Sequence, residues 1–83
     1  MLEFGNRIKD RHGNDTVEVY EDVNGVLHRI GTLRRCHNDT EWHSYGIRCV
    51  NKQTLCSNEG FGDNLTAAKN YLRADYRDLQ RHS

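Results

Sequence analysis

Residues 63–81 read DNLTAAKNYLRADYRDLQR, and their apolar side chains recur at the spacing of an α-helix. Five of them form one narrow apolar stripe: Leu65, Ala68, Leu72, Tyr76 and Leu79. Such a helix gains most of its stability by packing against another element. The pattern therefore predicts a helix over Asp63–Arg81, with Asp63 or Asn64 as its N-cap, and a hydrophobic partner elsewhere in the chain.

The partner predicted for this helix is a small antiparallel sheet. Apolar and polar residues alternate from Thr16 to Val23, as in a half-buried strand. Asn24-Gly25 then predicts a type I′ hairpin turn, because both central positions of that turn need positive φ. Further strands are expected over residues 26–36 and 41–50. We therefore expect residues 1–83 to form a single α+β domain, with three or more antiparallel strands and the C-terminal helix packed on one face.

A two-residue turn also predicts which strand residues face the core. Pairing Val23 with Val26 places one set on the core face: Val17, Val19, Val23, Val26 and Ile30. Leu27 and Leu33 fall on the opposite face, unless a bulge at Gly31 returns Leu33 to the core. In the third strand, the residues expected to face the helix are Tyr45, Ile47 and Cys49, while Trp42 and Arg48 point away. Residues 1–15 show little periodicity, and Leu2, Phe4 and Ile8 are expected to dock onto the core. In the loop-like residues 51–62, the expected anchors are Leu55 and Phe61.

Composition narrows the class of protein. The chain is 35% hydrophobic and 29% charged without proline, and its 12 basic residues balance 12 acidic ones. The zero net charge is unevenly distributed: residues 1–25 hold six acidic and three basic side chains, and basic residues are in excess over residues 26–50. The sequence contains neither a bilayer-spanning run nor a signal-like leader, so we expect a cytoplasmic protein with no membrane partner.

Two surfaces are candidates for binding a partner. On the helix, Lys69, Arg73, Arg77 and Arg81 recur every fourth residue, and cations so spaced repel one another unless a partner neutralises them. On the uncovered sheet face, Tyr20 is expected opposite Arg29, beside Trp42 and Arg48. The alternatives are an ordinary solvated helix face, and a Trp42 that covers a second cluster with Leu27 and Leu33.

No catalytic or metal centre is predicted. The three cysteines and two nearby histidines supply zinc-ligand types, but no CxxC or HxxxH pair is present: Cys36, Cys49, Cys56, His37 and His43. The five histidines are scattered and do not suggest a nucleophile with its base. We expect reduced thiols, no cofactor and no enzymatic activity.

The predicted layout resembles a known DNA-binding architecture. Three strands and a helix, with Trp42 and Tyr45 in the third strand, are similar to the arm-binding domains of phage-type integrases and to AP2-like modules, over roughly residues 16–80. In that family the sheet enters the major groove, so the resemblance implies DNA contacts by Arg29, Trp42 and Arg48. Those domains are more basic than this chain.

The size and polar composition also resemble small accessory proteins of phages and mobile elements, including anti-CRISPR-type inhibitors. Such proteins act by occupying a surface of a larger assembly. We therefore expect a non-enzymatic protein-binding module, an inhibitor or accessory protein of this type, with a nucleic-acid-binding domain as the alternative. The binding residues expected in both cases are Tyr20, Arg29, Trp42, Arg48, Lys69, Arg73 and Arg77. The target and the oligomeric state stay open.

Overall fold

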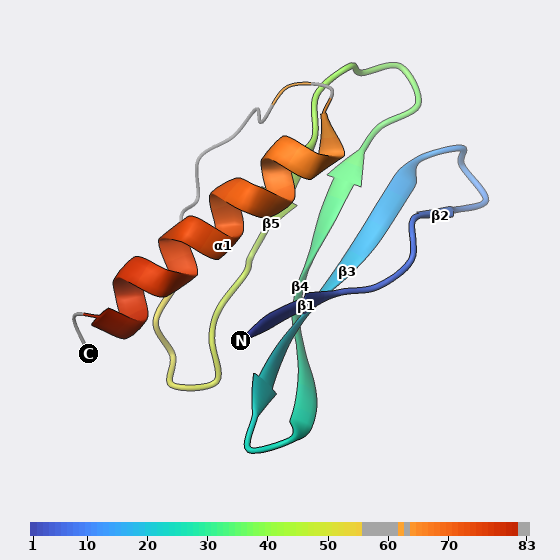
Figure 1. The fold of residues 1–83 in the computed structure, drawn as a ribbon. Coiled ribbons are helices and arrows are strands. Elements are labelled where there is room, and N and C mark those ends of the chain that lie inside the picture. Colours follow the sequence, from blue (N-terminus) through green and yellow to red (C-terminus); the bar gives the residue numbers. More distant parts are fainter. Residues whose placement is uncertain (56–61, 63, 82–83) are drawn as a thin grey trace.

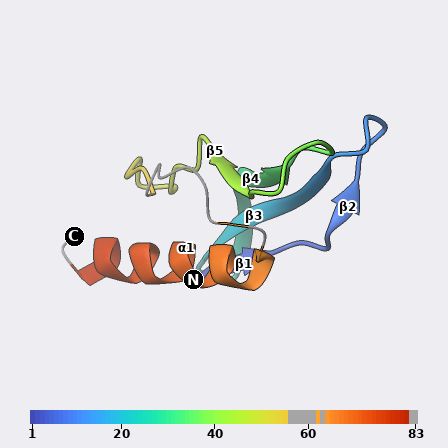
Figure 2. The ribbon, with the colours of Figure 1, turned by 90° about the horizontal axis from the view of Figure 1, so that it is seen from above.

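The computed structural model, which describes residues 1–55, 62 and 64–81, has the expected α+β architecture (Figure 1). It consists of an antiparallel sheet of five strands and the helix α1 (Leu65–Arg81). The strand order is β1-β3-β4-β5, and β2 pairs with β3 beyond the end of β1. Seen from above, α1 lies level with β1 at the front of the molecule, whereas β5 lies at the back (Figure 2).

The central hairpin follows the sequence pattern. β3 (Asp15–Val23) and β4 (Val26–Arg35) are joined by Asn24 and Gly25, whose φ angles of 54° and 82° are those of the predicted turn. Val23 is paired with Val26, as predicted. Asp22 stabilises the turn, because its carboxylate accepts a hydrogen bond of 2.9 Å from the Gly25 amide.

A bulge in β4 sets the faces of the sheet. Val19 pairs with Gly31 but Tyr20 pairs with Arg29, so Ile30 is the extra residue. The shift returns Leu33 to the core, where it is fully buried, as expected for a bulge near Gly31. Gly31 itself lies under Ile47: a Cβ there would come within 2.5 Å of the Ile47 side chain.

Three short strands complete the sheet, and the sequence did not predict their extent. β1 (Leu2–Phe4) and β2 (Ile8–Lys9) both pair with β3, in a segment that we expected to be irregular. Strands of two or three residues are too short to display a period of two. β5 is only His43–Tyr45 instead of residues 41–50, and Gly46 follows it with a φ of 59°. The regular pairing ends at that glycine, although the Arg48 amide still donates a hydrogen bond of 3.3 Å to the Ile30 carbonyl of β4.

The core lies where the sheet, α1 and residues 47–55 meet. The buried apolar residues are Leu2, Val17, Val19, Leu33, Trp42, Ile47, Cys49, Leu55, Ala68 and Leu72. Leu65, Tyr76 and Leu79 pack against them, which confirms the predicted helical stripe. Asn64 is the N-cap, because its side-chain oxygen accepts a hydrogen bond of 3.2 Å from the Ala67 amide. The other N-cap candidate, Asp63, and the expected anchor Phe61 lie outside the described residues.

Several expected core positions are instead exposed. Val26 is 56% exposed at the end of the hairpin, and Val23 beside it is only half-buried, because α1 does not extend over this part of the sheet. Tyr45 is 50% exposed rather than facing the helix, and Ile8 in β2 is also exposed. In the hairpin the alternation was read correctly, but the area that the helix covers was overestimated. Tyr45 was assigned to the wrong face, because it lies opposite Thr32 on the side of the sheet away from the core.

Candidate macromolecule-binding surfaces

The sheet surface away from the core carries two tyrosines and two paired arginines. Tyr20 lies opposite Arg29, as predicted, and Tyr45 of β5 lies opposite Thr32. We call this surface the outer sheet face, defined by Glu18, Tyr20, Arg29, Thr32, Arg34 and Tyr45. Arg29 lies 3.1 Å from the Glu18 carboxylate, and Arg34 lies 3.6 Å from that of Asp10. Both arginines of this face therefore already have acidic partners.

Trp42 does not belong to the outer sheet face, and the expectation that it points away from the core is wrong. The residue is fully buried, and its backbone amide donates a hydrogen bond of 2.9 Å to the Gly62 carbonyl. Ser44, two residues later, pairs with the buried Leu33, so Trp42 lies on the core side of the sheet. The backbone at Gly46, with a φ of 59°, breaks the alternation that we extended through Tyr45 and Ile47. The alternative, in which Trp42 clusters with Leu27 and Leu33, is half right: Leu33 shares the core, whereas Leu27 is 55% exposed.

Arg48 lies beside the bulge of β4, because its amide donates a hydrogen bond of 3.3 Å to the Ile30 carbonyl. It lies beyond β5, forms an isolated bridge with Thr54, and is exposed. Because Trp42 is buried, the set Arg29, Trp42 and Arg48, which the integrase-like resemblance implied as DNA contacts, is not assembled on one surface.

The Trp42 ring instead supports a cluster of cations. The guanidinium groups of Arg7 and Arg35 lie 5.3 and 5.8 Å from the ring centroid. Both also contact the buried carboxylate of Asp15, at 2.8 and 2.7 Å, and the Lys9 ammonium lies 3.7 Å from it. The hydrogen bonds from Arg7 and Arg35 lower the pKa of Asp15 from 3.8 to about 2. Three cations thus share one carboxylate.

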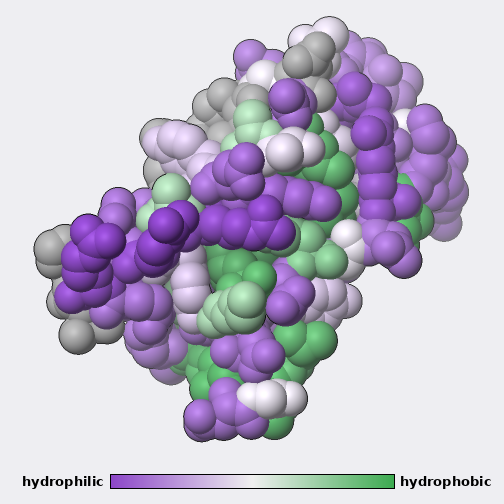
Figure 3. Space-filling view, in the orientation of Figure 1, coloured by the Kyte–Doolittle hydropathy of each residue, from purple (hydrophilic) through white to green (hydrophobic). Residues whose placement is uncertain are grey.

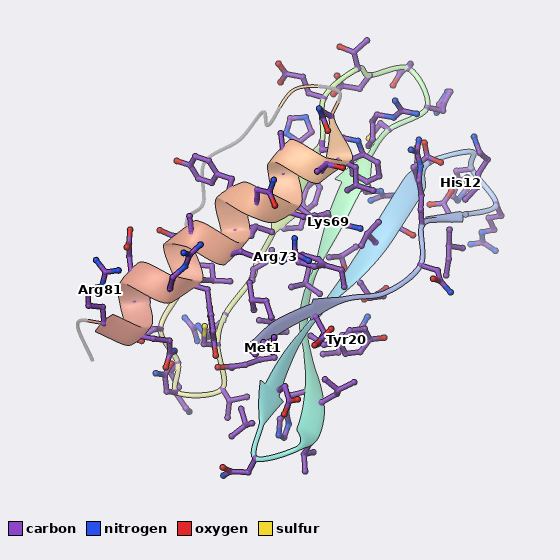
Figure 4. The ribbon with its side chains drawn as sticks, in the orientation of Figure 1. Met1, His12, Tyr20, Lys69, Arg73 and Arg81 are labelled. Atoms are coloured by element: carbon purple, nitrogen blue, oxygen red, sulfur yellow. The ribbon has the colours of Figure 1, made fainter. Side chains whose placement is uncertain are left out.

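The predicted basic ridge of α1 lies beside this cluster. Lys69 and Arg73 extend from α1 toward β1 (Figure 4), where they lie 5.5 and 4.8 Å from the Phe4 ring centroid. Arg77 lies one turn further along the helix. Phe4, which contacts Lys69 and Arg73, precedes Arg7 by three residues, so the Cα atoms of Phe4 and Arg7 are no more than about 11 Å apart.

These six residues form a surface that we call the basic face: Arg7, Lys9, Arg35, Lys69, Arg73 and Arg77. Its one acidic member among the described residues is Asp15, which is buried beneath the arginines. Asp75 and Asp78 lie on the other flank of α1, around Tyr71 and Ala74. Figure 3 shows a hydrophilic band across the front of the molecule, over α1 and β1, with hydrophobic atoms directly below it. The molecule has no net charge, but cationic side chains are concentrated on the basic face.

Sequence reasoning found the helical half of the basic face and missed the other half. Lys69, Arg73 and Arg77 recur every fourth residue, and this helical spacing is visible in the sequence. Arg7 and Lys9 are brought to Arg35 only through the register of β2, β3 and β4 around Asp15. The alternation of Arg7 and Lys9 is visible in the sequence, but it does not indicate that they lie beside Arg35.

A polar network with a structural role lies at the far end of the core. Glu21 is buried, and its carboxylate accepts hydrogen bonds of 2.7 Å from the Val50 amide and 2.8 Å from the Tyr76 hydroxyl. Burial and this bond to Glu21 raise the pKa of Tyr76 to about 12, so the hydroxyl stays a donor. Glu21 lies opposite His28 in the hairpin register, but its side chain is buried on the core side.

The cysteines do not form a metal site among the residues described. Cys49 is buried in the core, and burial raises the pKa of its thiol to about 11. Cys36 is half-buried, and Cys56 lies outside the described residues. No group of three or more potential ligands that could hold a metal ion occurs in the part of the chain that the structure describes. Over the same residues, no helix has the length and apolar character required to cross a bilayer.

Comparisons of the chain with protein-family models, with curated proteins and with solved structures give no match. The basic face and the outer sheet face are therefore interpreted from their own geometry.

Proposed function

We propose that this domain is a non-enzymatic binding module whose basic face contacts the phosphate backbone of a nucleic acid. The observation that carries the proposal is the gathering of six cations on one face, three of them around one buried carboxylate. Four of the six are arginines, whose planar forks match the geometry of phosphate oxygens. Cations gathered in this way repel one another, and a polyanion would relieve that repulsion.

The structure holds these cations in place before any partner arrives. Arg7 and Arg35 are fixed between the Trp42 ring and Asp15, and Lys69 and Arg73 lie over Phe4. Side chains that are already ordered lose less conformational freedom on binding. Along α1 the cations follow one another at about 6 Å intervals, which is four residues at 1.5 Å each. The helix therefore offers a regular row of charges.

The proposal places nucleic acid on a different surface from the one implied by the integrase-like resemblance. On the outer sheet face, Arg29 and Arg34 would have to exchange Glu18 and Asp10 for phosphates. On the basic face the cations outnumber the single carboxylate, so contact with phosphate leaves no acidic group displaced.

A salt titration tests the proposal. Fluorescence anisotropy with a labelled duplex of about 16 base pairs, at 50 to 200 mM salt, measures how affinity depends on counterions. If five of the six cations meet phosphates, the logarithmic slope is about −4.5, and the affinity falls by two to three orders of magnitude over this range. Replacing Arg73 or Arg77 by Ala reduces the slope by about one each.

Arg29→Ala is the matched control, because it removes the same charge from the opposite surface. It is expected to leave the slope unchanged. If a basic-face variant and the Arg29 variant had equal slopes, binding would depend on the net charge of the protein and not on which face carries the charge. Failure to bind any nucleic acid at 50 mM salt would eliminate the proposal and leave an acidic protein as the partner of the basic face.

A second candidate function, binding of a protein, is favoured by the outer sheet face. Its two arginines are already paired with carboxylates, and it presents Tyr20 and Tyr45. Aromatic and arginine side chains with little unpaired charge are typical of protein interfaces. This face is the basis on which an inhibitor or accessory role, of the kind found in mobile elements, is proposed.

Two tyrosines provide a matched test of this second candidate. Tyr45 on the outer sheet face is 50% exposed, and Tyr71 on α1 is 45% exposed. In capture experiments from a bacterial lysate, Tyr45→Ala is expected to lose the partner and Tyr71→Ala to keep it. Retention of every partner by the Tyr45 variant would reject this face as the interface.

A further inference from the structure

A pocket opens at the edge of the basic face, between α1 and β1. It has a volume of about 290 Å³ and is lined by Met1, Leu2, Arg73, Tyr76 and Arg77. Two of these residues belong to the basic face, so a ligand in the pocket lies beside the row of cations. The size is near the lower limit for small-molecule sites, about 300 Å³, which suits one flat ring system better than a larger ligand.

The lining decides what kind of group can enter. Leu2 and the Tyr76 ring supply apolar walls, and Met1, which is 72% exposed, borders the opening. The Tyr76 hydroxyl is already occupied, because it donates to Glu21 at 2.8 Å and accepts from the Met1 amino group at 2.9 Å. The pocket can therefore bind the flat face of a ring by van der Waals contact. The Tyr76 hydroxyl is not free to form a hydrogen bond with polar atoms at the edge of that ring.

The surroundings restrict the direction of a bound strand. The neighbouring pocket includes Glu21 and Asp22 in its lining, at the hairpin side of Tyr76. Carboxylates there disfavour phosphates, whereas Arg73 and Arg77 favour them on the helix side. A strand that uses the pocket is thus directed along α1 toward Lys69 and the Trp42 cluster.

We infer that this pocket receives an unpaired base of a single-stranded nucleic acid, while Arg73 and Arg77 hold the phosphates on either side of that base. The inference rests on the proposed function and refines it to a substrate class. A base within an intact duplex is stacked and paired, and its face is not available to the pocket. Contact between a base and an aromatic side chain tolerates different bases, so the recognition depends on strandedness more than on sequence.

Three probes with equal numbers of phosphates separate the contribution of the base to affinity from that of the phosphates. They are a thymine oligonucleotide, an oligonucleotide of the same length whose sugars carry no bases, and a duplex with the same total number of phosphates. The wild-type protein is expected to bind the thymine strand about tenfold more tightly than the abasic strand. Equal affinity for all three probes would overturn the inference and leave the proposed function standing. If none of the three binds, the proposed function itself fails.

Variants of Tyr76 provide the matched control. Tyr76→Ala is expected to abolish the difference between the thymine and abasic strands, and Tyr76→Phe, which keeps the ring, to retain it. Because the alanine variant risks unfolding, photocrosslinking of the wild-type protein to a strand with one 5-iodouracil gives an independent test. The crosslink is expected in residues 74–77, the tryptic peptide that contains Tyr76. A crosslink confined to the outer sheet face would overturn the inference.

Discussion

Replacement of Asp15 by Asn is expected to destabilise the fold and, at the same time, to strengthen nucleic-acid binding. The side chain is nearly isosteric, so the change removes charge with little change of volume. In the folded protein, the Asp15 carboxylate accepts from Arg7 and Arg35 at 2.8 and 2.7 Å. The substitution leaves both guanidiniums on Trp42 without their anion, which weakens the fold but increases the charge available to a phosphate.

The pKa of Asp15 gives the size of the effect on stability. A fall from 3.8 to about 2 on folding corresponds to about 2 kcal/mol, at about 1.4 kcal/mol for each pH unit. Arg7 is half-exposed, and screening of that contact by solvent lowers the expected value to between about 1 and 2 kcal/mol. Because the folded pKa is the lower one, this stability is complete above pH 4 and is lost as the pH falls toward 2.

Urea denaturation measures this loss. At pH 6 the free energy of unfolding of the wild-type protein is expected to be about 1 to 2 kcal/mol higher than that of the Asp15→Asn variant. The difference is expected to fall to about half of that at pH 3 and to nearly zero at pH 2. In the anisotropy assay, the same variant is expected to bind more tightly and to have a salt slope steeper by about one. Asp78→Asn, which removes an equal charge from the other flank of α1, is the control.

Two results would refute this reasoning. A difference in stability that is the same at pH 6 and pH 2 would mean that the carboxylate charge does not stabilise the fold. Weaker nucleic-acid binding by a folded Asp15→Asn protein would mean that the cluster on Trp42 does not contact phosphate.

Three further substitutions test the packing that positions these surfaces. Gly31→Ala is expected to cost about 1 to 3 kcal/mol in thermal unfolding, because the new Cβ would lie 2.5 Å from the Ile47 side chain; an unchanged melting temperature would contradict that close approach. Tyr76→Phe removes a hydrogen bond to the buried Glu21 carboxylate and is expected to cost about 1 to 2 kcal/mol in urea denaturation, whereas a neutral effect would show that Glu21 finds another partner. Asn64→Ala is expected to cost about 1 kcal/mol through loss of the N-cap, with Asn64→Asp as the variant that restores stability.

Features that depend on neighbouring residues were predictable. The helical stripe, the Asn24-Gly25 turn and the pairing of Val23 with Val26 all follow from local spacing and backbone preference. The return of Leu33 to the core also followed, once Gly31 was considered as a place for a bulge. In each case the determining residues lie within one helix or one hairpin.

Features that depend on how far one element covers another were missed. Val26 alternates correctly with its neighbours, yet it is exposed because α1 does not cover the hairpin tip. Trp42 was placed by extending an alternation that, in the structure, is broken at Gly46. The helical half of the candidate site was predicted from its period, whereas Arg7, Lys9 and Arg35 had no shared pattern to connect them.

The amino-acid sequence alone thus determined the helix, the hairpin and the row of cations on α1, because each is set by interactions between residues close in the chain. Only the tertiary structure decided that Trp42 is buried, that Asp15 gathers three cations around it, and that this cluster lies beside the cations of α1. Those placements depend on strand register and on the packing of segments far apart in sequence. A single sequence carries no local signal for such contacts.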